Sequence, residues 1–259
     1  MIASLLKTQA YAFASAVRFL SVIPLPPLPG EEEGDWRRHL TLSLFFYPLV
    51  GLLLGSTFLL IVIGLESVFQ PALLAATVLG VWVFLSGALH LDGLADCADA
   101  WVGGLGSKEK TLAIMKDPAC GPVGVSVIVV LLLLKFSALL QLLSSGFPAV
   151  YLIFPPLLGR LAIVLMRLTT PYVREGGLGQ EVFGSSPVRP LIVQCIVIVG
   201  VLTFFFLDVF IALFVASALI FFIVRKVSMV RLSGCTGDVL GAVVELTELA
   251  SLLALCLYF

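Results

Sequence analysis

Charged residues are scarce in this sequence. Asp, Glu, Lys and Arg make up 12% of its 259 residues, whereas a soluble domain has roughly 25%. Hydrophobic residues make up 60%, and the mean hydropathy is +1.16. The net charge of -1 gives no basic field, so we expect no nucleic-acid partner. The composition predicts an integral membrane protein without a separate soluble domain.

The sequence also lacks the residue patterns of several common catalytic centres. Its five cysteines are an odd number without a CxxC pair, which argues against a disulfide framework or a zinc site. The Walker A, GxSxG and HExxH motifs are absent, which argues against the nucleotidases and hydrolases that use them. Because His39 and His90 are its only histidines, we expect His90 to pack or to support a substrate site rather than act as a general base.

Long hydrophobic runs are abundant. A spanning helix needs about 20 mostly apolar residues, and seven runs qualify: 41–65, 70–91, 123–145, 147–169, 190–207, 208–224 and 238–258. For the fifth and sixth runs we favour a tight external turn around Asp208 over one long tilted helix from 190 to 224. The predicted fold is an all-α polytopic transmembrane helix bundle, one membrane domain over residues 1–259, with re-entrant or interfacial helices on its cytoplasmic side.

The N-terminal segment resembles a signal peptide only in part. Arg18 interrupts its apolar run, and PLPPLPG stands where a small-residue cleavage site is needed. We therefore expect residues 1–25 to be a retained interfacial or re-entrant segment.

The positions of Lys and Arg predict the orientation. If successive loops lie on alternate sides of the membrane, twelve of these cations fall on one face and none on the other. The loops of that other face hold only two charged residues, Glu66 and Asp208. Positive residues in short loops stay cytoplasmic, so the N-terminus is predicted inside and the C-terminus outside a bacterial inner membrane. All longer loops are on the basic face, so a site built from loops faces the cytoplasm. These loops are 26–40, 92–122, 170–189 and 225–237.

Three aspartates lie at the end of the second run, in HLDGLADCADAW, residues 90–101. On a continuous helix Asp92, Asp96 and Asp99 share one face. Because an aspartate at the bilayer centre costs about +2.5 to +3.5 kcal/mol, we expect them to end in a watery or cation-filled cavity. Oxygen ligands suit Mg²⁺ shared with substrate phosphates, and Gly93 leaves room for a ligand or a second helix. The simpler alternative is a solvated helix end.

A second acidic group lies in GCTGDVLGAVVELTELA, residues 234–250. Asp238 begins the last run, where an anion also suits the helix dipole. Glu245 shares its face, and Glu248 lies one turn deeper. Carboxylates within a membrane are functional candidates by default, although a buried hydrogen-bonded pair is the structural alternative.

Several cations could bind phosphate. Lys116 and Asp117 lie at a break after a short amphipathic helix, where a surface charge pair is the ordinary alternative. Arg160, inside the fourth run, needs an anion, either one of the carboxylates or a substrate phosphate. Arg174 lies in TTPYVREGGLGQEVFG, whose glycines suit a mobile lid. Carboxylates for metal and cations for phosphate together indicate phosphoryl-type chemistry on an amphiphilic substrate.

These motifs resemble those of the cobalamin synthase family, the adenosylcobinamide-GDP ribazoletransferases. The resemblance covers nearly the whole chain in order, through RFLSVIPLP, FFYPLVGLLLG, GALHLDGLADCADAW, IMKDPACGPVG, the GR at 159–160, REGGLG and GCTGDVLGAVVELTEL. It implies a Mg²⁺-dependent membrane enzyme that joins adenosylcobinamide-GDP to α-ribazole or α-ribazole 5'-phosphate and releases GMP.

The resemblance also suggests roles for the site residues. The Mg²⁺ bound to the diphosphate is expected to be held by Asp92, Asp96 and Asp99. Asp238 and Glu245 would complete this site or accept the hydroxyl proton. The substrate-binding residues are expected to be His90, Lys116, Asp117, Arg160 and Arg174.

Two other functions are compatible with parts of the sequence. A CDP-alcohol phosphotransferase needs Ala-Arg where this chain has Ala95 and Asp96, and the missing arginine counts against it. An ion-coupled transporter needs access from both sides, whereas the loops favour one face and no inverted repeat is visible. Small residues along the runs would permit a homo-oligomer within the lipid.

Overall fold

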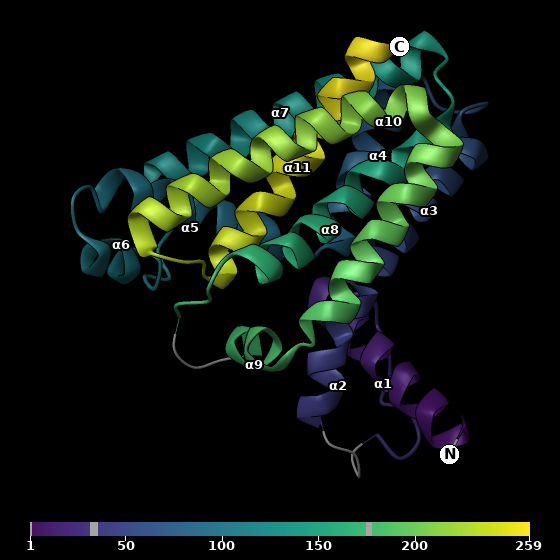
Figure 1. Cartoon of the computed structure of the whole chain (residues 1–259). Coiled ribbons are helices and arrows are strands. Elements are labelled where there is room, and N and C mark those ends of the chain that lie inside the picture. Colours follow the sequence, from purple (N-terminus) through teal and green to yellow (C-terminus); the bar gives the residue numbers. More distant parts are fainter. Residues whose placement is uncertain (1, 32–35, 175–177) are drawn as a thin grey trace.

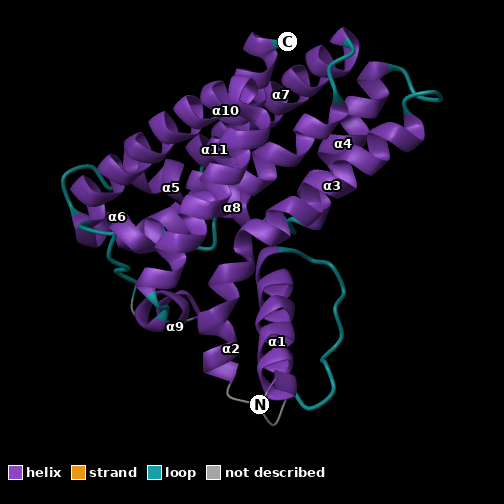
Figure 2. Ribbon diagram, turned by 45° about the vertical axis from the view of Figure 1, so that its right-hand side comes forward, coloured by secondary structure: helices purple, strands orange, loops and turns teal. Residues whose placement is uncertain are grey.

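The computed structural model describes the chain except residues 1, 32–35 and 175–177. Its described helices are α1 (Ile2–Leu20), α2 (Trp36–Ser43), η1 (Leu44–Phe46), α3 (Tyr47–Leu65), α4 (Pro71–Leu85), α5 (Leu89–Gly103), α6 (Lys108–Ile114), α7 (Pro122–Ser145), η2 (Ala149–Ile153), α8 (Phe154–Thr169), α9 (Leu178–Ser185), α10 (Val188–Leu232) and α11 (Gly237–Tyr258). This part of the chain contains no strand, as Figure 2 shows. The expected all-α class is confirmed.

Several of these helices are long and apolar enough to cross a membrane. Among the described residues they are Trp36–Leu65, α7, Ala149–Thr169, α10 and α11, and the bent pair α4 and α5 is a sixth candidate. Prolines in the first turn begin α3, α4, α7 and α8, where the fixed φ fits and the missing N–H costs nothing. The polytopic membrane fold is confirmed, whereas the number of seven spans is not.

The run expected to cross from 70 to 91 ends earlier. α4 stops at Leu85, and α5 leaves it at an angle of 84°. Gly87 and Ala88 both have positive φ (62° and 54°) at this bend, a conformation that favours glycine. A side chain at Gly87 would also overlap that of Val22, whose N–H donates to the Leu85 carbonyl (2.9 Å). The sharp bend separates α5, with its aspartates, from the apolar run.

α10 reverses the direction of the chain. Phe206 within it has non-helical φ and ψ (-138° and 32°). Arg167 donates to the carbonyl of Ser186, just before α10, and Arg225 donates to the carbonyl of Thr169 (2.7 Å). Residues 186 and 225 therefore both lie near the end of α8, although a straight helix between them would be about 60 Å long. The reversal at Phe206 lies close to the turn expected at Asp208, and Figure 1 shows two arms diverging from it.

The two ends of the bundle hold different connections. At one end, ring contacts join Phe147, Tyr151, Phe206 and Phe259, which bring the turn after α7, the break in α10 and the C-terminus together. At the other end, Arg231 donates to the Trp101 carbonyl (2.9 Å). Figure 1 shows the C-terminus and the break in α10 at the upper right, with α6 and α9 away from them. The loops after α5, α8 and α10 lie at this second end, which is called the loop-rich end below.

α11 occupies the centre of the bundle, against α5, α7, α8 and α10. Glycines permit its close approach to α5. A Cβ on Gly93 would lie 2.9 Å from the Asp238 Cα, and a Cβ on Gly241 would lie 3.1 Å from the His90 Cα. Small residues let helix backbones approach closely in a membrane. A second helix, α11, therefore occupies the room expected beside Gly93.

Candidate active site

Two helices bring three acidic side chains together at the loop-rich end. Asp92 and Asp96 lie one turn apart on α5, and Asp238 lies in the first turn of α11 beside Gly93. The three carboxylates are close enough to interact electrostatically. Asp92 is exposed, while Asp96 and Asp238 are partly buried. The two acidic motifs, which are far apart in the sequence, therefore meet as expected.

A local hydrogen-bond pattern fixes Asp238. The Thr236 hydroxyl caps α11 by accepting from the Val239 N–H (3.4 Å), and it lies 3.2 Å from Asp238 Oδ2, to which it can donate. The preceding segment is held by Cys235, whose N–H donates to the Pro171 carbonyl (2.8 Å). Burial raises the pKa of the Cys235 thiol to about 12, so it stays neutral and unreactive.

Arg174 reaches Asp238 from the loop after α8. Its Nη1 lies 3.3 and 3.2 Å from the two carboxylate oxygens of Asp238. The Val173 N–H donates to the Cys235 carbonyl (2.9 Å), which pins this loop to the start of α11. Residues 175–177 of the expected lid, Glu175 among them, lie outside the described residues. Among the predicted cations, Arg174 is the one paired with a site carboxylate in the part of the chain that the structure describes.

Asp99 makes a different set of contacts from its two neighbours on α5. Its Oδ2 accepts from the Gly121 N–H (2.7 Å), and its Oδ1 accepts from the Gly124 N–H (2.9 Å). A Cβ on either glycine would lie 2.6 Å from this carboxylate, so a larger residue at either position would displace it. Asp99 therefore joins α5 to the first turn of α7, where an anion is also favoured by the helix dipole. Its predicted role as a metal ligand stays a prediction.

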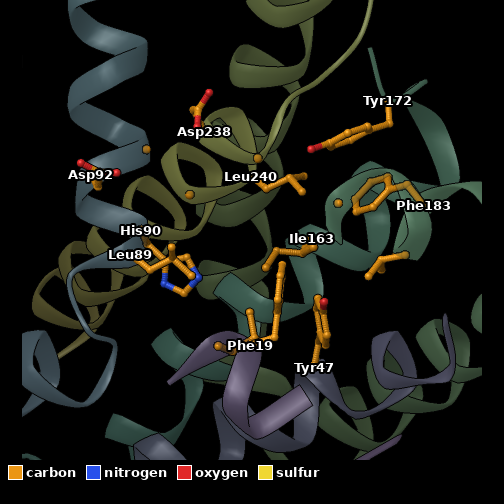
Figure 3. A pocket seen from close by; sticks show the side chains of 16 residues that line it. Phe19, Tyr47, Leu89, His90, Asp92, Ile163, Tyr172, Phe183, Asp238 and Leu240 are labelled. Carbon is orange, nitrogen blue, oxygen red and sulfur yellow. The ribbon is translucent and has the colours of Figure 1, made fainter. Parts of the chain in front are cut away.

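A pocket opens beside Asp92 and Asp238 (Figure 3). Its empty volume is about 710 Å³, including the open mouth. In Figure 3 these two aspartates lie on the opposite side of the pocket from Phe19 and Tyr47, with His90 between. The remaining lining residues come from α1, α5, α8, α9, α11 and the loop after α8: Leu20, Leu89, Gly93, Ile163, Tyr172, Gly179, Val182, Phe183, Gly237, Leu240 and Gly241.

Tyr172 contributes a hydroxyl to this pocket. Burial raises the pKa of Tyr172, so the hydroxyl remains protonated at neutral pH and can donate a hydrogen bond. Its ring lies 5.2 Å from that of Phe183 on α9. No sequence pattern indicated Tyr172, Tyr47 or Phe19 as pocket residues, because aromatic residues in an apolar chain are ordinarily packing residues.

A separate ionic network lies deeper in the bundle. Lys135 Nζ of α7 contacts Glu245 (2.6 Å) and Glu248 (2.7 Å) of α11, and Arg160 of α8 pairs with Glu248. Each of these side chains is at most 3% exposed. The anion that Arg160 needs is therefore the carboxylate of Glu248. Glu245 and Glu248 form the buried hydrogen-bonded arrangement that was the structural alternative for these residues. Neither Glu245 nor Arg160 lines the pocket.

Lys116 and Asp117 lie at the surface. Both are exposed, and Asp117 accepts from the Ala119 N–H (3.0 Å), as expected for a turn. Neither residue lines the pocket of Figure 3. Within the described ranges, no three His, Cys, Asp or Glu side chains form a ready-made metal site. A divalent ion at Asp92, Asp96 and Asp238 would therefore need further ligands from a substrate or water.

Comparison with known proteins identifies the family of this chain. The model of the family described as cobalamin-5-phosphate synthase matches residues 12–256. Similar curated proteins are the adenosylcobinamide-GDP ribazoletransferases of Pseudomonas syringae (44% identity; 95% of this chain, 98% of the relative) and Pseudomonas aeruginosa (48%; 93% and 96%). No solved structure gives a significant match. Because the family model covers nearly the whole chain, this protein belongs to the cobalamin-5-phosphate synthase family.

Proposed function

We propose that this chain transfers the adenosylcobinamide phosphate group from adenosylcobinamide-GDP to α-ribazole or α-ribazole 5'-phosphate. GMP leaves, and adenosylcobalamin or its 5'-phosphate forms. The supporting observation is that Asp92 and Asp238, which come from the two acidic motifs of the chain, line one pocket at the loop-rich end. The relatives named adenosylcobinamide-GDP ribazoletransferase match along nearly their whole length.

The reaction exchanges one phosphorus–oxygen bond for another. A ribose hydroxyl of the acceptor attacks the phosphorus attached to cobinamide, and the bond from that phosphorus to the departing GMP breaks. The hydroxyl proton passes to a carboxylate. We assign this role to Asp238, because it faces the pocket, whereas Glu245 is held by Lys135 away from it.

Arg174 would neutralise phosphate charge during this exchange. It is partly exposed, with 36% of its side chain accessible, and its contact with Asp238 is long enough to be replaced by a phosphate contact. A guanidinium offers several donors in a plane, which suits phosphate oxygens. We assign Arg160 to the support of α11 instead, because its side chain is fully buried against Glu248.

We propose that these acidic residues share a Mg²⁺ site, although among the described residues they do not form a complete one by themselves. Asp92, Asp96 and Asp238 offer only oxygen ligands, and Mg²⁺ is commonly held by one or two carboxylates together with substrate phosphates and water. When bound, Mg²⁺ would neutralise the charge of the diphosphate. We assign Asp99 to positioning, because both of its oxygens already accept backbone N–H groups.

We also propose that the pocket faces the cytoplasm of a bacterial inner membrane. The loop-rich end carries Arg174 at the site and Arg231 against the last turn of α5. The connections at the opposite end contain Glu66 and Asp208 and no Lys or Arg. Basic residues in short loops are retained on the cytoplasmic side.

A reconstitution assay tests the function. Purified protein is incubated with adenosylcobinamide-GDP, α-ribazole and Mg²⁺, and the cobalamin and GMP formed are measured together. Equal amounts of both products are expected, and Asp96→Asn should lower the rate about 100-fold or more. Asp208→Asn, an exposed aspartate at the opposite end, is the matched control and should keep full activity. Failure of the unaltered protein to release GMP in the presence of acceptor would refute the proposal.

A further inference from the structure

The pocket beside Asp92 and Asp238 has a second, apolar half. The rings of Phe19 and Tyr47 are nearly parallel, with centroids 6.1 Å apart and an interplanar angle of 19°. Figure 3 shows both rings extending toward Ile163, with His90 beside them. Leu20, Val182 and Phe183 add further apolar surface. This wall can cover a flat apolar ring, but it offers few partners for a polar one.

Two polar atoms in this half lack a partner among the described residues. They are the hydroxyl of Tyr47 and Nδ1 of His90, in side chains that are only 1% and 3% exposed. The hydroxyl of Ser43, one turn before Tyr47, donates to the Leu40 carbonyl (2.6 Å), and its oxygen lies near the Tyr47 hydroxyl without forming a hydrogen bond of normal geometry. Buried polar groups are nearly always hydrogen-bonded, so each such atom needs an explanation. Both atoms have almost no accessible surface, so a ligand with one or two polar atoms would supply their partners once the side chains that cover them move aside.

The apolar half of the pocket, with only two polar atoms, suits some rings of the substrates better than others. Guanine has a carbonyl, an amino group, a ring N–H and free ring nitrogens, and the two polar side chains could not satisfy them all. Burying such groups unpaired is strongly unfavourable. A benzimidazole is apolar along most of its edge and has one ring nitrogen that is free to accept a hydrogen bond when the other is bonded to ribose.

We propose that the apolar half of the pocket binds the base of the acceptor, a benzimidazole-type ring, and that the Tyr47 hydroxyl donates to its free ring nitrogen. This assignment rests on the function proposed above and names its acceptor subsite. The ribose then extends past His90 toward Asp92 and Asp238, where its hydroxyl meets the carboxylate that takes its proton. Tyr47 is a specificity-determining residue that contacts the base rather than the reacting atoms.

The test removes the two partners of this hydrogen bond separately. Tyr47→Phe deletes only the hydroxyl, and an indole riboside replaces the accepting ring nitrogen of a benzimidazole riboside by a carbon. We expect Tyr47→Phe to raise the KM for the benzimidazole riboside roughly 3- to 10-fold, with little change in kcat. The KM for the indole riboside should stay the same. The unaltered protein should prefer the benzimidazole riboside by a similar factor, a measurement that needs no variant.

Tyr11→Phe is the matched control, because the Tyr11 hydroxyl donates to the Pro29 carbonyl (2.7 Å) and does not line the pocket. It should leave both KM values unchanged. An equal change in KM for the two ribosides in Tyr47→Phe, or no preference in the unaltered protein, would overturn the assignment of the base. In either case the enzyme would still form product, so this failure is distinct from a failure of the proposed function, in which no acceptor yields cobalamin or GMP.

Discussion

Replacing Lys135 by methionine tests the buried ionic network. Methionine keeps a similar length without the charge, so Glu245 loses its 2.6 Å partner and Glu248 keeps only Arg160. Removing one partner of a buried ion pair costs about 3 to 5 kcal/mol, because the other charge stays buried. At about 2 to 4 °C per kcal/mol for a chain of this size, we expect the unfolding midpoint to fall by roughly 6 to 20 °C.

The assay is thermal unfolding of purified protein in one detergent. The double variant Lys135→Met/Glu245→Gln removes the unpaired carboxylate while keeping the Glu248 and Arg160 pair, so it should recover at least half of the loss. Lys110→Met, on the exposed surface of α6, is the control and should leave the midpoint unchanged. A midpoint within about 2 °C of the unaltered protein for Lys135→Met, or a double variant less stable than the single one, would refute the network.

Three further predictions test other contacts. Gly93→Ala should destabilise the protein by about 1 to 3 kcal/mol, because the new Cβ would lie 2.9 Å from the Asp238 Cα, whereas Gly80→Ala, with open space around it, should not; unfolding midpoints check this pair. Asp99→Asn should cost about 1 to 3 kcal/mol and increase proteolysis of the loop before α7, because one amide oxygen cannot replace both carboxylate acceptors. In a variant with Cys120 as its only cysteine, a membrane-impermeant maleimide should label this exposed thiol in inside-out vesicles and not in spheroplasts; the opposite pattern would reverse the proposed orientation.

Local sequence patterns predicted the elements that depend on neighbouring residues. The spacing of Asp92 and Asp96 places both on one face of α5, as expected for positions one helical turn apart. The glycines at the start of α11 indicated a close approach, which Gly241 makes to His90. The apolar runs located most helices that could cross a membrane, because a bilayer requires long apolar segments whatever their partners are.

Contacts between distant segments could not be predicted in the same way. The apolar run through residues 70–91 gave no sign of the bend, which depends on Gly87 meeting Val22. Lys135 and Glu245 each lie within an apolar run of the sequence, but their pairing depends on how α7 packs against α11. For Asp99, the sequence could not distinguish a metal ligand from a cap for α7, because either use needs a carboxylate at that position.

The two acidic groups of the chain differ in how their charge is balanced. Glu245 and Glu248 face two cations, Lys135 and Arg160, so the deep network is neutral and can remain buried without a ligand. Among the ion pairs of the described residues, the group of Asp92, Asp96 and Asp238 has only the one between Asp238 and Arg174, which leaves two negative charges in and beside the pocket when all three are ionised. Like charges held this close repel, so they favour the binding of a divalent cation or a cationic group of a substrate. The unbalanced group at the loop-rich end, rather than the balanced one in the bundle, is therefore where ligand binding gains most electrostatic free energy.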